Sequence, residues 1–184
     1  FTDWHIEAEL AWDITMGSEE VVVAVIDSGI TYDHEDLEAN IWLNENEIVN
    51  NGIDDDNNGY IDDDMGWDFV GEDIYNPIPD NDPMDGLGHG THVAGIVAAP
   101  INDIGVVGVC PNCQLMNLKV GDDDRYLDGA AIISAIDYAI SEGVNIINAS
   151  YGMYGVWEPE RDAVNDAYAA GILFVAAAGN DHTD

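Results

Sequence analysis

A run of six residues, Val21-Val-Val-Ala-Val-Ile26, constrains the fold more than any other segment of the chain. It is continuously apolar, rich in β-branched residues, and ends at Asp27-Ser-Gly29, a sequence that favours a turn. A strand without polar alternation is buried on both of its faces, as strands are in a parallel sheet covered by helices. This one run therefore already favours an α/β protein.

The rest of the chain repeats this theme. Similar runs predict three more strands, at Gln114–Val120, Val144–Ala149 and Ile172–Ala177. Helical patterns lie between them, at Thr91–Ala99, Gly129–Glu142 and Glu158–Ala170, and Gly143 and Gly171 follow the last two as stops. Alternating strands and helices predict a doubly wound, mostly parallel sheet with helices on both faces. The segment from Asn40 to Asp85 breaks the alternation, and irregular segments of that length usually act on or bind something.

Composition limits the partners of the chain. With 184 residues and 47% hydrophobic content, the chain is long enough for one domain with a core. Three basic residues stand against 38 acidic ones, giving a formal net charge of −35 that would repel nucleic acids and anionic membranes. No apolar run reaches the roughly 18 residues that span a bilayer. Self-repulsion at this charge predicts a need for calcium or for high salinity.

Two residues have the character of a catalytic pair. Asp27 stands at the carboxyl end of the first predicted strand, where open α/β sheets bind ligands, although Asp before Ser-Gly is also an ordinary turn residue. His89 lies in Gly88-His-Gly-Thr-His-Val-Ala-Gly95, where small residues at a helix start let the backbone approach closely and keep the imidazole accessible. The nucleotide-binding alternative fails because no Gly-x-Gly-x-x-Gly turn follows the first strand.

Three segments carry a family resemblance. Val25–Ile30, Gly88–Gly95 and Ala176–Asn180 resemble three of the four signature blocks of the subtilases, in the family's order, and the similarity extends through Trp12–Thr15 and Asn148–Gly152. The resemblance implies a secreted serine endopeptidase of the subtilisin type that hydrolyses peptide bonds through an Asp-His-Ser triad. In it His89 is the general base, Asp27 orients the histidine, and the Asn180 amide stabilises the oxyanion.

The fourth block, Gly-Thr-Ser-Met-Ala, does not occur in the sequence, and none of the five serines stands in a similar context. In the family this block lies beyond the position of Asn180. We therefore expect residues 1–184 to be a partial catalytic domain, incomplete at the C-terminus and inactive alone. A non-catalytic acidic calcium-binding module is the alternative. It explains the charge and the missing serine, but not the three blocks in family order.

The resemblance also implies a substrate-binding groove. Ser150-Tyr151-Gly152 and Ala177-Ala178-Gly179 correspond to opposite walls of the pocket for the residue before the scissile bond. The family usually has Leu where Tyr151 stands. Arg125-Tyr126-Leu127 corresponds to the edge strand that pairs with extended substrate, and a surface loop before a helix is the alternative. The substrates would be polypeptides.

An acidic insertion around residues 44–85 predicts calcium binding. Asp54, Asp56, Asn58 and Asp62 supply oxygen atoms at positions 1, 3, 5 and 9 of an EF-hand-like loop, with Gly59 at position 6 and the Tyr60 carbonyl at position 7. Position 12 is Met65, so Asp63 or Asp64 would complete the shell. A merely solvated acidic loop is the alternative. The resemblance implies a second site that combines Asp36 with a loop containing Pro100, Asn102, Ile104 and Val106.

The remaining features receive local interpretations. Cys110 and Cys113 are expected to be a structural pair, bridged or free, because no second Cys or His cluster accompanies them. His92 is expected to pack in its helix rather than to bind zinc with His89. Subtilases are usually exported with a prosegment, so a signal sequence and an inhibitory prosegment would both lie outside this chain. We expect a monomer.

Overall fold

The protein forms one parallel sheet of five strands in the order β2-β3-β1-β4-β5. The computed structural model describes residues 6–124, 126–152 and 155–180. The strands are β1 (Val22–Asp27), β2 (Gly66–Asp68), β3 (Gln114–Lys119), β4 (Ile146–Ala149) and β5 (Leu173–Ala176). The predicted doubly wound α/β class is therefore confirmed, and each predicted strand is present with its ends moved by two residues or fewer. The short β2, inside the irregular segment, was not predicted.

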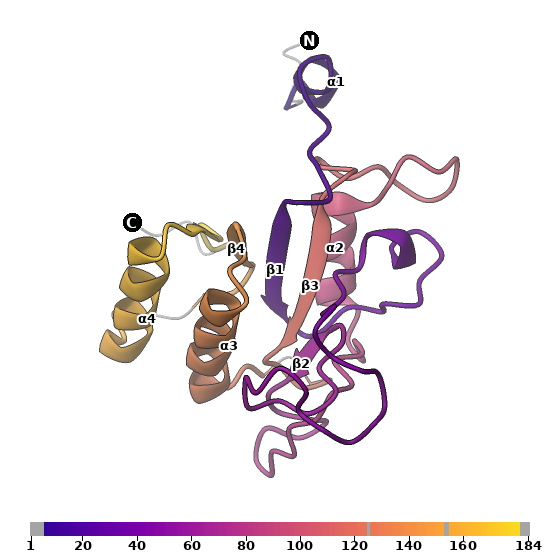
Figure 1. Ribbon diagram of the computed structural model, residues 1–184. Coiled ribbons are helices and arrows are strands. Elements are labelled where there is room, and N and C mark those ends of the chain that lie inside the picture. The colour runs from indigo at the N-terminus through magenta and orange to yellow at the C-terminus, as the bar shows by residue number, and fades with distance from the viewer. Residues whose placement is uncertain (1–5, 125, 153–154, 181–184) are drawn as a thin grey trace.

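Helices cover both faces of the sheet. α2 (His89–Ala98) packs on one face against β1 and β3, while α3 (Gly129–Ser141) and α4 (Glu158–Ala169) lie together on the other (Figure 1). The short α1 (Ala8–Trp12) stands beyond the sheet, and a 3-10 turn, η1, covers Glu38–Asn40. None of the helices in the described part of the chain combines the length and apolar character that a membrane span requires.

The core explains why β1 has no polar alternation. Val23 and Val25 point into a cluster with α2, while Ala24 and Ile26 point into a larger cluster that contains side chains of α3 and α4. All four side chains are buried, and full burial of a Val or Ile stabilises a fold by about 1.5–3 kcal/mol. At the sheet edge, β5 differs, because Leu173 and Val175 remain 60% and 45% exposed.

The carboxyl ends of the strands lie together at one end of the sheet. In the sheet register, Asp27 on β1 is level with Lys119 on β3, which is level with Asp68 on β2. Lys119 and Asp68 form a buried ion pair of 2.9 Å between Nζ and Oδ2. Figure 1 shows much of the irregular segment gathered at this end of the sheet, and α1 at the opposite end. The fold thus places the Lys119–Asp68 ion pair and much of the irregular segment at the end of the sheet where Asp27 lies.

Candidate active site

Asp27 and His89 are joined by a short hydrogen bond. The His89 Nδ1 lies 2.6 Å from the Asp27 Oδ1, which also accepts the backbone N–H of Ser28 at 2.8 Å. An ionised carboxylate can only accept, so Nδ1 carries the proton and Nε2 is left as a base. Asp27 is 4% exposed, whereas the His89 side chain is 53% exposed. A buried orienting carboxylate and an accessible imidazole are the arrangement that general-base catalysis requires.

The local sequence allows β1 and α2 to approach this closely. α2 begins at His89, two residues earlier than predicted, after Gly88 in a left-handed conformation with φ of 91°. A Cβ atom on Gly90 would lie 2.1 Å from the Gly29 carbonyl oxygen and 3.0 Å from the Asp27 Cβ. Glycine at position 90 is therefore a steric requirement of the Asp27–His89 pair.

The pair opens into a cavity of about 580 Å³. The cavity brings both residues together with four of the predicted substrate-binding residues, from two further parts of the chain. Its lining consists of Asp27, Ser28, Leu87, Gly88, His89, His92, Asp122, Leu127, Ser150, Tyr151 and Gly152. Burial raises the pKa of Tyr151, and the nearby Glu160 carboxylate adds to the effect. Tyr151 therefore lines the wall as a neutral phenol.

Other predicted residues lie apart from this cavity. Asn180 and the segment 177–179 follow β5, are exposed, and do not line the cavity. Tyr126 is 54% exposed and belongs to a short turn in which Gly121 and Leu127 form an antiparallel bridge. Arg125 lies outside the described residues. The structure therefore gathers one predicted wall of the substrate pocket and leaves the opposite wall and the oxyanion amide open to solvent.

Two serines line the cavity, and both are engaged by other groups. The Ser28 hydroxyl donates to the Asp85 Oδ1 and accepts the Gly90 N–H, each at 3.0 Å. The Ser150 hydroxyl accepts the Asn148 Nδ2 at 2.9 Å. The Ser28 O–H is thereby directed to Asp85, and neither serine hydroxyl makes a hydrogen bond to His89 within the described residues.

Comparison with known proteins places this arrangement in a family. The model of the subtilase family matches residues 18–184. The chain belongs to the subtilases. It is 42% identical over 170 residues to Subtilisin-like protease 1 of Plasmodium berghei, which covers 91% of this chain and 27% of that protein. Over 160 residues it is 38% identical to Subtilisin DY of Bacillus licheniformis, covering 87% of this chain and 47% of that protein.

A third relative is the halolysin-like extracellular serine protease Nep of Natrialba magadii, 37% identical over 179 residues. That alignment covers 97% of this chain and 29% of the relative. The subtilase chain described by these residues therefore spans less than half the length of each of these three relatives.

The acidic insertion of this subtilase contains a compact group of carboxylates. One oxygen each from Glu47, Asp54 and Asp56 lies within 4.8 Å of the other two, a spacing that a single cation could bridge. Asp54 and Asp56 are two of the predicted ligands. Glu47 was not predicted, because it precedes the loop by seven residues and no spacing rule points to it.

The predicted ligands of the loop also make hydrogen bonds within the protein, Asp54 and Asp56 included. The Asn58 Oδ1 accepts the N–H of Tyr60, and the Asp62 carboxylate accepts the N–H groups of Asn51 and Gly52. Asp63 is fully buried and accepts the Tyr138 hydroxyl of α3 at 2.5 Å. Burial raises the pKa of Asp63, with the bonds from Tyr138 and Asn58 acting against it. Asp63 therefore joins the loop to the core.

The second predicted calcium site is built around Asp36, which is 3% exposed. Its Oδ2 accepts the N–H of Val106 at 2.8 Å, while its buried Oδ1 accepts no hydrogen bond from the described residues. The loop that contains Val106 also carries the other predicted ligands, Pro100, Asn102 and Ile104, and the Asn102 Oδ1 accepts the Ile104 N–H at 3.2 Å. A buried carboxylate oxygen without a donor is costly, so a cation there fits the residues present.

Proposed function

We propose that the protein is a serine endopeptidase of the subtilisin type, with Asp27 and His89 as two members of its triad. The single observation that carries the proposal is the 2.6 Å bond between the buried Asp27 and the accessible His89 at the wall of a cavity. Family membership supports the same chemistry. Since Ser28 and Ser150 are engaged elsewhere, we propose that the nucleophilic serine comes from sequence outside residues 1–184.

In the proposed reaction His89 works at Nε2, because Nδ1 is held by Asp27. Nε2 takes the proton of the serine hydroxyl as its oxygen attacks the scissile carbonyl, and then delivers that proton to the leaving amine. A water molecule, activated by the same nitrogen, hydrolyses the acyl-enzyme and restores the serine. Asp27 stabilises the imidazolium formed in both steps. The Asn180 amide would donate to the oxyanion once its segment is drawn toward the cavity.

Polypeptide substrates fit the lining of the cavity. Ser150, Tyr151 and Gly152 form one wall, with Ala177, Ala178 and Gly179 proposed as the other. The turn that contains Tyr126 and Leu127 would offer backbone groups to an extended chain, and Arg125, the preceding residue in the sequence, is proposed to take part with them. The wall formed by residues 150–152 contributes no charged side chain, which favours uncharged residues before the scissile bond.

Calcium is proposed at two places. Glu47, Asp54 and Asp56 would hold one ion, and Asp36 with the loop at 100–106 would hold the other. Exhaustive chelation is expected to lower the melting temperature, because an ion that binds only the folded state stabilises it. Asp36→Asn should remove part of that calcium-dependent increment while leaving the rest. A melting temperature unaffected by chelation would contradict both sites.

Secretion, an inhibitory prosegment and a monomeric state are further parts of the proposal. Secretion is supported by a relative whose name describes it as extracellular, and by the acidic surface, which suits a saline medium. The prosegment follows from family membership alone. Sedimentation of the protein should give the mass of one chain.

The test compares residues 1–184 with a longer product of the same gene that includes the serine block. The longer protein should hydrolyse peptides and react with a fluorophosphonate. Asp27→Asn should lower kcat about 10,000-fold and His89→Ala about a million-fold, magnitudes taken from other serine proteases. Residues 1–184 alone should hydrolyse nothing.

Two results would overturn the proposal. Peptidase activity of residues 1–184 that His89→Ala abolishes would show that the serine lies within this chain. A longer protein that binds calcium and has no peptidase activity would favour the non-catalytic calcium-binding module instead.

A further inference from the structure

Asp85 is a half-buried carboxylate that takes no part in the triad, yet it is bonded to residues on both sides of the Asp27–His89 pair. Its Oδ1 accepts the Ser28 hydroxyl at 3.0 Å and the N–H groups of Leu87 and Gly88 at 2.9 and 2.8 Å. Its Oδ2 accepts the Thr91 N–H at 2.9 Å and the Thr91 hydroxyl at 2.5 Å. Five donors therefore converge on one side chain.

These donors come from the two elements that carry the pair. Ser28 directly follows Asp27 at the end of β1, and Thr91 lies two residues after His89 in the first turn of α2. Further bonds join the same elements: Gly90 donates its N–H to the Ser28 hydroxyl, and Thr31 donates its N–H to the Thr91 hydroxyl at 2.9 Å. The Asp85 carboxylate lies at the centre of this network.

We propose that Asp85 is a positioning residue that fixes the Asp27–His89 distance by bonding β1 to the first turn of α2. This inference rests on the proposed function, because the fixed distance matters only if His89 acts as a base. Misplacing a catalytic group by about 1 Å can reduce a rate about 100-fold.

A carboxylate is required for this task, since both oxygens must accept. An amide of the same shape would keep one acceptor and turn an NH₂ group toward either Ser28 and the turn or Thr91. On that side of the network, the amide NH₂ group would then point at another hydrogen-bond donor instead of accepting from it. The balance at Asp85 agrees with this: burial acts to raise its pKa, but the bonds from Thr91, Gly88 and Ser28 outweigh burial and leave the pKa below its ordinary value.

An ordinary helix cap would stabilise α2 without affecting the pair, so the test needs a matched cap. Asp128 provides it: this residue caps α3, its Oδ1 accepts the Ala131 N–H at 2.7 Å, and within the described residues its side chain makes no hydrogen bond to β1. Asp85→Asn and Asp128→Asn each remove one charge from a carboxylate that accepts the N–H of the third residue of a helix, Thr91 in α2 and Ala131 in α3. The effect of either change on stability is read from urea unfolding.

The decisive measurement is the tautomer of His89, from the ¹⁵N shifts of its two ring nitrogens in residues 1–184 at neutral pH. The unmodified protein should hold the proton on Nδ1. Asp85→Asn should move a measurable fraction of it to Nε2, and so should Ser28→Ala, which removes the hydroxyl that bonds both Asp85 and the Gly90 N–H. Asp128→Asn should leave the tautomer unchanged.

In the longer protein Asp85→Asn should lower kcat by about 10- to 100-fold with KM within about twofold, and Asp128→Asn should change neither by more than about twofold. An unaltered tautomer in both Asp85→Asn and Ser28→Ala would overturn the inference, as would an equal shift in Asp128→Asn. Measuring the tautomer does not require catalytic activity. A longer protein without peptidase activity would therefore contradict the proposed function but would not affect the test of Asp85.

Discussion

At the scale of single residues, the Asp27–His89 pair depends on Gly90, because only a residue without a side chain fits between α2 and the end of β1. Gly90→Ala would press a methyl group against the Gly29 carbonyl oxygen, which is backbone and cannot turn aside. We expect it to cost about 1–3 kcal/mol in the free energy of unfolding, because overpacking at a rigid contact forces backbone shifts. Urea unfolding of the variant measures this cost.

Gly95→Ala is the matched control, since Gly95 lies in the same helix and its added methyl would meet only the Val106 side chain, at 3.7 Å. That contact is ordinary, so the higher helix propensity of alanine should leave the protein unchanged or stabilise it by up to about 1 kcal/mol. Equal destabilisation by both variants would mean that the approach of Gly90 to Gly29 has no special importance.

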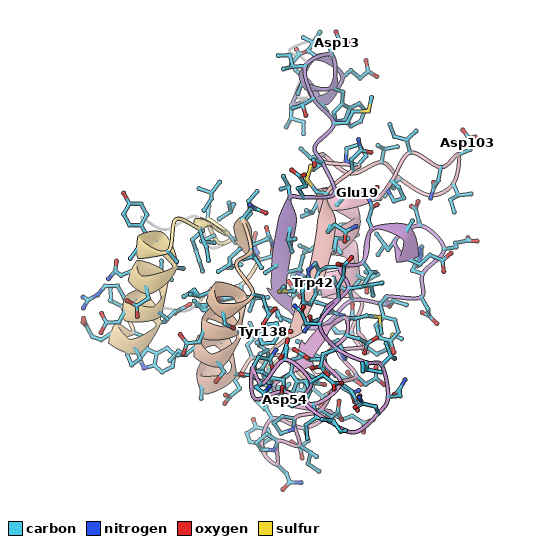
Figure 2. The ribbon with its side chains drawn as sticks, viewed as in Figure 1. Asp13, Glu19, Trp42, Asp54, Asp103 and Tyr138 are labelled. Carbon is cyan, nitrogen blue, oxygen red and sulfur yellow. A yellow bond between two sulfur atoms is a disulfide. The ribbon has the colours of Figure 1, made fainter. Side chains whose placement is uncertain are left out.

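At the scale of elements, hydrogen bonds hold the acidic insertion against α3, although the carboxylates that accept these bonds repel one another. Figure 2 shows Tyr138 directed from α3 toward the loop that carries Asp54. Beside it the Asn58 Nδ2 donates to both the Asp63 Oδ2, at 2.9 Å, and the Glu142 Oε1, at 3.2 Å. Burial raises the pKa of Glu142, the Asn58 bond opposes this, and the charges of Asp56 and Asp63 add to the rise. Ionised Glu142 thus costs stability.

Glu142→Gln should therefore stabilise the chelated protein at neutral pH, by at most about 1 kcal/mol because the site is only half buried. Glutamine keeps the acceptor for Asn58 and loses the repulsion. The sign follows from the raised pKa: the cost of Glu142 is full above its folded pKa, shrinks as pH falls through it, and vanishes below the ordinary value of 4.5. Melting temperatures from pH 4 to 8 measure the difference.

The exposed Glu38→Gln serves as the control, since Glu38 lies on η1 at the protein surface. It should change the melting temperature little and without the same pH dependence. A Glu142→Gln variant that is less stable than the parent at pH 8 would show that the charge is stabilising and that the assigned repulsion is wrong.

The elements also show which parts of the fold could be predicted from the sequence. Four strands and three helices were predicted because each is a long apolar run or a clear helical pattern. β2 has three residues, one of them Gly66 and another Asp68, and it exists because β3 offers a partner about fifty residues away along the chain.

Among site residues, Asp27 and His89 were predicted from their motifs, and the structure places the Asp27 Oδ1 2.6 Å from the His89 Nδ1. Glu47 and Asp85 were missed because both lie in the irregular segment, where no periodic signal marks them, and their partners are set by the folded arrangement of loop backbone and side chains. The place of Asp63 was missed for a related reason: its partner Tyr138 comes from a helix 75 residues away.

At the scale of the whole molecule, the net charge of −35 sets the response to salt. Raising sodium chloride from 0.1 to 1 M shortens the screening length from about 10 to about 3 Å and weakens the self-repulsion of the folded state. With chelator present, the melting temperature should rise by about 3 °C for each kcal/mol of repulsion relieved. Potassium chloride should act equally, and a melting temperature that falls with both salts would contradict the argument.

For residues 1–184, the exposed strand β5 gives the same charge a second consequence. An edge strand with unpaired backbone groups and apolar side chains such as Leu173 and Val175 is a template on which another copy could add its own strand. Mutual repulsion between highly acidic molecules keeps such edges apart in dilute buffer. Salt stabilises each folded molecule but also screens the repulsion between molecules. The protein should therefore stay in solution longest at an intermediate salinity, and above it turbidity should increase although the melting temperature is at its highest.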